Sequence, residues 1–115
     1  MSDMPIDKDA LYELVDEDPE FLASLVDTFV DDCSTYMTEI RSAVEAEDPI
    51  TLREEAHGLK GAVANLQAAS AEEAARRVEE AARTRDFEGA EEAVEELEEE
   101  IDRLQSALAD MVEET

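Results

Sequence analysis

Apolar residues recur at every third or fourth position along most of the chain, which is the spacing of one face of an α-helix. The first such segment, about Asp7 to Val15, is short. Asp18-Pro19 gives an N-cap followed by proline at the first helical position, and the helix that it opens reaches about Glu45. Its apolar face carries Leu22, Leu25, Phe29, Cys33, Tyr36, Ile40 and Val44. No segment alternates as a strand does, so the pattern predicts an all-α protein.

Three more helices follow. Asp48-Pro49 repeats the start signal and opens a helix through about Ala68, and Ser70 to Glu73 matches a capping box that opens the next. The last helix begins near Asp86. Its apolar positions are Ala90, Val94, Leu97, Ile101, Leu104, Leu108 and Met111. That repeat covers only about three heptads, which favours an intramolecular bundle over a coiled coil, with residues 1–115 forming a single domain.

The charge of the chain narrows the choice of partners. Acidic residues number 34 against 9 basic ones, for a formal net charge of -25. Such a surface argues against nucleic acid and against anionic membranes, both of which recruit lysine and arginine. Like charges would face each other in a dimer through the last helix, so we expect a monomer. A folded chain this acidic also repels itself, and salt screens that repulsion. We therefore expect a high-salt cytoplasm, as in a halophile.

Cysteine, histidine and hydropathy exclude further classes of protein. Cys33 is the only cysteine and lies on an apolar helix face, so we expect a buried small side chain. The N-terminus lacks the basic flank and apolar run of a signal peptide, and no apolar stretch approaches ~20 residues. We therefore expect a soluble, cytoplasmic protein. A single histidine cannot supply the paired Glu-x-x-His motifs of a di-metal bundle, so no metal site is predicted.

The segment from Ala56 to Ala62 contains the only histidine and two of the three glycines of the chain. Both glycines lie within a predicted helix, where each costs roughly 1 kcal/mol relative to alanine. We expect that something approaches the backbone closely beside His57.

The third predicted helix has two distinct faces at 100° per residue. The core stripe consists of Leu52, Ala56, Leu59, Val63 and Leu66. A second face carries His57, Lys60, Gly61 and Ala64, with Arg53 one turn earlier. His57 is thus predicted to project outward among small residues, where another surface can dock.

This arrangement suits phosphoryl transfer through histidine. Neutral imidazole is nucleophilic near neutral pH because its ordinary pKa is about 6.5. The Lys60 ammonium group can neutralise part of the charge of a phosphoryl group beside it. Glu54 adds a negative charge that opposes phosphorylation unless Arg53 or Lys60 offsets it.

The residues around His57 resemble the histidine-containing phosphotransfer (HPt) family of two-component relays. The family pattern, His-x-Leu-Lys-Gly-small-small-x-x-Leu, matches His57-Gly58-Leu59-Lys60-Gly61-Ala62-Val63-Ala64-Asn65-Leu66. Asp18 to Leu22 is similar to the opening of the family, and Arg83 to Phe87 to its final hairpin. Two positions depart from the family: Gln67 stands where glycine is frequent, and Gly58 where a polar or basic residue is common.

The resemblance implies a four-helix up-and-down bundle with a short additional N-terminal helix. It implies that His57 accepts a phosphoryl group from a receiver-domain aspartate and passes it to another receiver, with Lys60 supporting the group and Gly61 keeping the site open. A hybrid sensor histidine kinase is the implied upstream partner. Magnesium belongs to the receiver, and without a Gly-rich nucleotide loop the chain is expected to be a phosphocarrier that neither binds ATP nor autophosphorylates.

Two other functions stay open at this point. A helical module of this shape can bind a receiver domain without carrying phosphate, and a purely structural acidic bundle leaves Gly58 and Gly61 unexplained. Whether or not phosphate is transferred, we expect a docked partner to contact Arg53, Gly58, Ala64 and Gln67. Leu22, Val26 and Val30 on the second helix are further candidates for the docking surface. Some of the three must belong to the core instead, and the sequence cannot sort them.

Overall fold

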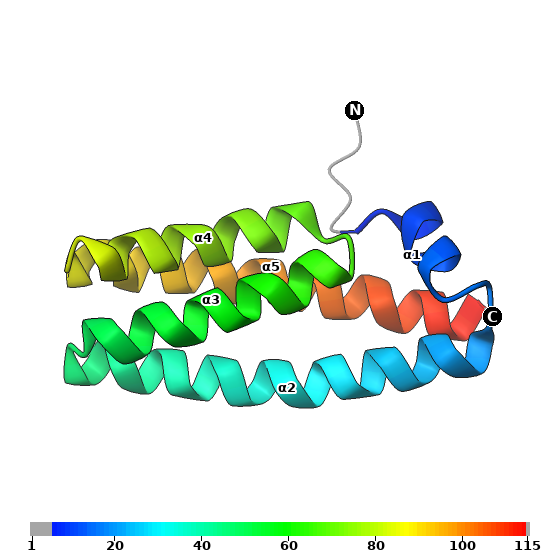
Figure 1. The fold of residues 1–115 in the computed structure, drawn as a ribbon, viewed down its shortest axis with the longest axis horizontal. Coiled ribbons are helices and arrows are strands. Elements are labelled where there is room, and N and C mark those ends of the chain that lie inside the picture. Colours follow the sequence, from blue (N-terminus) through cyan, green and yellow to red (C-terminus); the bar gives the residue numbers. More distant parts are fainter. Residues whose placement is uncertain (1–5, 115) are drawn as a thin grey trace.

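The computed structural model describes residues 6–114, which form five helices and no strand within that range. The helices are α1 (Lys8–Leu14), α2 (Pro19–Ala46), α3 (Pro49–Asn65), α4 (Ala69–Arg83) and α5 (Phe87–Glu114). Helices α2 to α5 run alternately up and down side by side, and α1 lies at one end, near the start of α2 and the end of α5 (Figure 1). The predicted four-helix bundle with a short additional N-terminal helix is confirmed.

Aspartate caps start most of these helices, as the sequence predicts. The side chains of Asp7, Asp18 and Asp48 accept hydrogen bonds from backbone N–H groups in the first turns of α1, α2 and α3. Asp86 accepts one from Gly89 at the start of α5. These bonds satisfy donors that have no partner within the helix, which fixes where each helix begins.

The predicted boundary between α3 and α4 is wrong. Helix α3 ends at Asn65 rather than near Ala68, and α4 begins at Ala69 with no side-chain cap, so Ser70 is helical and makes no capping box. Packing explains the early turn, because Leu66 and Ala68 are both buried within it. Gln67 between them adopts the left-handed conformation, with φ of 61°.

The core is made of small and branched aliphatic side chains. The predicted core stripe of α3, from Leu52 to Leu66, is almost fully buried. Helix α4 contributes mainly alanines to the interior, which lets it pack closely on α3, its most extensive neighbour. Cys33 is buried as expected, and burial, with a smaller effect of Asp102, raises the pKa of its thiol to about 11.

The structure sorts the three candidates for docking on α2. Leu22 and Val26 are buried and belong to the core, so neither can form a docking surface, whereas Val30 is exposed. Valine and leucine at three- and four-residue spacing can face either the core or a docking partner. Only the packing of α2 against the other helices decides which. Within residues 6–114, no helix has the length and apolar character that a membrane crossing requires.

Candidate functional site

His57 projects from α3 away from the core. Its neighbours Ala56 and Leu59 are fully buried and fix the orientation of the helix, and the His57 side chain is 68% exposed. The predicted exposure of the imidazole is therefore present in the structure, and the ring is open to an approaching molecule.

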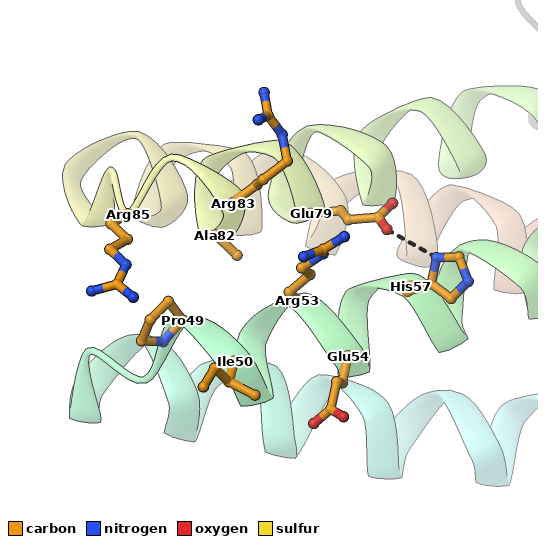
Figure 2. A pocket seen from close by; sticks show the side chains of 9 residues that line it. All are labelled: Pro49, Ile50, Arg53, Glu54, His57, Glu79, Ala82, Arg83 and Arg85. Atoms are coloured by element: carbon orange, nitrogen blue, oxygen red, sulfur yellow. Dashed lines mark hydrogen bonds and ion pairs between the residues drawn. The ribbon is translucent and has the colours of Figure 1, made fainter.

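One carboxylate of the neighbouring helix holds both His57 and Lys60. Glu79 on α4 places Oε2 at 2.9 Å from Nδ1 of His57 and Oε1 at 2.7 Å from Nζ of Lys60. Figure 2 shows the contact with His57. The Glu79 side chain is only 18% exposed, so these bonds lie in partly desolvated surroundings. The three side chains form a triad across the interface between α3 and α4.

The charge state of Glu79 determines the tautomer of His57. Burial alone would raise the pKa of Glu79, but hydrogen bonds from Lys60 and His57 outweigh it and hold that pKa below its ordinary value. An ionised carboxylate only accepts hydrogen bonds, so Nδ1 of His57 must carry the hydrogen. In the neutral ring the lone pair then lies on Nε2, which points away from Glu79 (Figure 2).

The two glycines beside His57 have different environments. A β-carbon at Gly58 would lie 2.7 Å from Cε1 of Tyr36, so the missing side chain makes room for the Tyr36 ring of α2. The close approach that the sequence predicts is thus made at Gly58 by the protein itself. A β-carbon at Gly61 would meet nothing within 4 Å, which leaves open space one turn from His57.

The remaining predicted site residues are not all near His57. Arg53 is exposed and lines the same hollow as His57, and Ala64 is half-buried two turns beyond the histidine on the same face of α3. Gln67 lies in the turn after α3, roughly 15 Å further along the helix direction at ~1.5 Å per residue. The structure brings Arg53, Lys60 and Gly61 to His57 and leaves Gln67 apart from them.

A hollow of about 480 Å³ opens beside His57, between the first half of α3 and the end of α4. It is lined by Pro49, Ile50, Arg53, Glu54, His57, Glu79, Ala82, Arg83 and Arg85. Three of the nine basic residues of this acidic chain thus lie around one depression.

Sequence reasoning missed Glu79, the residue that contacts His57 most closely. Its carboxylate is one of many on α4 and α5, and it is 22 residues from the histidine. A signal was available, because Glu79 follows Ala75 by four residues and precedes Ala82 by three, and both alanines are buried. Glu79 therefore borders the interior face of α4, where an acidic side chain needs a partner.

Comparisons with known proteins identify the family and agree with the fold. The family model of the Hpt domain matches residues 24–107 of the chain. The crystal structure of the histidine-containing phosphotransfer protein HptB from Pseudomonas aeruginosa PAO1 superposes with a TM-score of 0.87, at 26% sequence identity and over 99% of each chain. No curated protein sequence matches significantly. Because the family match spans most of the chain, this protein belongs to the Hpt domain family, the phosphotransfer proteins of two-component relays.

Proposed function

We propose that His57 accepts a phosphoryl group from the phosphorylated aspartate of one receiver domain and passes it to the aspartate of another. A hybrid sensor histidine kinase is the expected source of the phosphate. The observation that carries the proposal is the bond from Nδ1 of His57 to Glu79, because it orients an exposed ring and leaves Nε2 as the free nucleophile.

The transfer step is a displacement at phosphorus. The lone pair on Nε2 forms the N–P bond while the P–O bond to the partner's aspartate breaks, and that aspartate leaves as a carboxylate. The ring gains positive charge as the N–P bond forms. The Glu79 carboxylate, already in contact with Nδ1–H, stabilises this charge without having to move. Return of the phosphoryl group follows the same path in reverse.

Lys60 acts in this scheme mainly through Glu79. Its ammonium group lies 2.7 Å from Oε1 and is only 25% exposed, so it keeps the carboxylate ionised and oriented toward His57. Lysine has three donors, so the same ammonium group can also attract the incoming phosphoryl group. Gly61 adds the open space through which the partner approaches.

The chain's own residues need no nucleotide for this step, and magnesium would be held by the receiver rather than by this domain. We propose that the protein is a monomeric, cytoplasmic phosphocarrier without autokinase activity. Its net charge of -25 suits a high-salt cytoplasm, where dissolved ions screen repulsion between surface carboxylates.

The proposal is tested by incubating the protein with a purified, phosphorylated receiver domain and following acid-labile, base-stable phosphate on this chain. His57→Gln should abolish the label while the helical circular dichroism spectrum stays unchanged. Glu79→Gln should slow labelling by roughly 10- to 100-fold, the range expected on losing a hydrogen bond to a charged group.

Glu72→Gln is the matched control for Glu79→Gln, because it removes one exposed carboxylate from the same helix without touching the triad. It should label at the wild-type rate. Label that persists on His57→Gln would contradict the site. If a receiver binds the chain but phosphate never moves to it, the domain is a docking module instead.

A further inference from the structure

Two arginines have no carboxylate partner among the residues that the structure describes. Every other basic side chain from residue 6 to residue 114 forms an ion pair with a glutamate. Arg53 and Arg85 form none with the described residues, although the chain has 34 acidic residues. Both line the hollow beside His57. The fold therefore leaves two unpaired guanidinium groups around the hollow that His57 lines. The lining carries three arginines against two glutamates, Glu54 and Glu79.

The same hollow exposes an apolar side chain. Ile50 is 68% exposed, the largest fraction among the bulky hydrophobic residues that the structure describes. In Figure 2, Arg85 reaches from the turn between α4 and α5 toward Pro49, while Arg53 lies between Glu79 and the start of α3. An apolar ridge is thus flanked by two guanidinium groups, a combination typical of the central part of protein interfaces.

The charge of this hollow contrasts with that of the whole molecule. A chain with a net charge of -25 repels an anionic partner over most of its surface. A phosphorylated receiver is such a partner, because its reacting group is a carboxylate that bears a phosphoryl group. Unpaired arginines beside His57 attract that surface to the one place where reaction can occur.

We propose, on the basis of the phosphotransfer function above, that this hollow is a docking site for the receiver domain. Arg53 and Arg85 pair with carboxylates of the receiver beside its phosphorylated aspartate, and Ile50 packs under an apolar side chain of the receiver. Arg85 lies at the opposite end of the hollow from His57 (Figure 2), so the two arginines span a surface rather than a single phosphoryl group.

The test compares two phosphodonors on the same variants. The first donor is a phosphorylated receiver domain that labels the wild-type chain, and the second is phosphoramidate, a small molecule that phosphorylates imidazole without docking. Arg53→Gln/Arg85→Gln should lower the ratio of the two rate constants, receiver over phosphoramidate, by about 10-fold or more. Ile50→Ser should lower the same ratio while leaving the charge unchanged.

Arg41→Gln/Arg77→Gln is the matched control. It removes the same charge from two exposed arginines that pair with α5 glutamates outside the hollow, and the ratio should stay within twofold of wild type. An unchanged ratio in Arg53→Gln/Arg85→Gln, or an equal loss in the control, overturns the docking site. Equal losses with both donors mean that the arginines bind the phosphoryl group itself, which also overturns it.

Failure of the docking site is distinguishable from failure of the proposed function. If no receiver labels the wild-type chain while phosphoramidate does, the function fails and the docking site falls with it. If the receiver labels the wild type and Arg53→Gln/Arg85→Gln equally well, only the docking site fails.

Discussion

At the scale of single residues, one carboxylate separates His57 from an ordinary surface histidine. Glu79 contacts Nδ1 of His57 and Nζ of Lys60 with its two oxygens, so a single side chain fixes the tautomer and holds the cation. Lys60, which the sequence predicts to lie beside the phosphoryl group, already donates a hydrogen bond to Glu79. Lys60 and Glu79 are therefore expected to act together on His57.

We predict that Lys60 and Glu79 act as a unit. Lys60→Ala alone should slow phosphorylation of His57 by phosphoramidate, because Glu79 loses the cation that orients it. In a Glu79→Gln background the same change should have much less effect, since coupled residues are not additive. Lys8→Ala, which removes an ammonium group from α1, serves as the control. Multiplicative effects of Lys60→Ala and Glu79→Gln would show that Lys60 acts on the phosphoryl group directly.

The lowered pKa of Glu79 predicts a dependence of stability on pH. In the unfolded chain the ordinary value is 4.5, and in the folded protein the pKa is lower. A depressed folded pKa contributes stability above pH 4.5, and that contribution is lost as the pH falls through the folded value. Wild type should therefore lose stability relative to Glu79→Gln below about pH 4.5 in denaturant titrations. A difference that stays constant down to about pH 3 would contradict the ionised triad.

At the scale of helices, the turn between α3 and α4 sets the position of the site. Leu66 and Ala68 are buried on either side of Gln67, so the chain must reverse within a few residues. That reversal puts Gln67 into the left-handed region, which the family commonly fills with glycine. The early turn brings α4 back along α3, and Glu79 reaches His57 as a result.

We predict that Gln67→Gly stabilises the protein. The left-handed conformation costs a residue with a side chain roughly 1–2 kcal/mol, and the entropic cost of glycine is roughly 0.5–1 kcal/mol. Glycine should therefore gain roughly 0.5–1 kcal/mol in chemical denaturation. Gln105→Gly, the same change inside α5, should instead destabilise by about 1 kcal/mol. Destabilisation at both positions would contradict the strain at Gln67.

The helices and the interior face of α3 follow from the sequence, because aspartate caps and three- and four-residue spacing are local signals. The start of α4 does not, since the burial of Leu66 and Ala68 prevails over the local capping pattern at Ser70. His57 and Lys60 share a face by helical angle alone. Glu79 joins them only because of the register in which α4 packs on α3. That register cannot be predicted from a single sequence.

At the scale of the whole molecule, charge opposes the fold. With a net charge of -25 on 115 residues, the glutamates of α5 lie close together and outnumber the arginines that pair with them, Arg41, Arg77 and Arg103. Coulomb repulsion among them destabilises the compact state. At physiological ionic strength, dissolved ions screen this repulsion between charges more than about 8 Å apart, and more salt shortens that distance. Salt should therefore influence stability more than any single surface ion pair does.

We predict that the melting temperature rises by about 5–10 °C between 0.05 and 2 M potassium chloride, roughly 1–2 kcal/mol of relieved repulsion. A variant with Glu92→Gln, Glu95→Gln and Glu99→Gln removes three exposed charges of α5. It should melt higher than wild type at low salt and respond less to added salt. A wild-type melting temperature independent of salt would contradict both this prediction and the proposed high-salt setting.

The most direct measurement of the central claim is nuclear magnetic resonance of the phosphorylated protein carrying ¹⁵N-labelled histidine. Phosphorus–nitrogen coupling identifies which ring nitrogen of His57 bears the phosphoryl group. Because Glu79 occupies Nδ1, we predict phosphorus on Nε2, with the Nδ1 hydrogen retained. Phosphorus on Nδ1, or a stable phosphoryl group elsewhere on the chain while His57 stays unmodified, would contradict it.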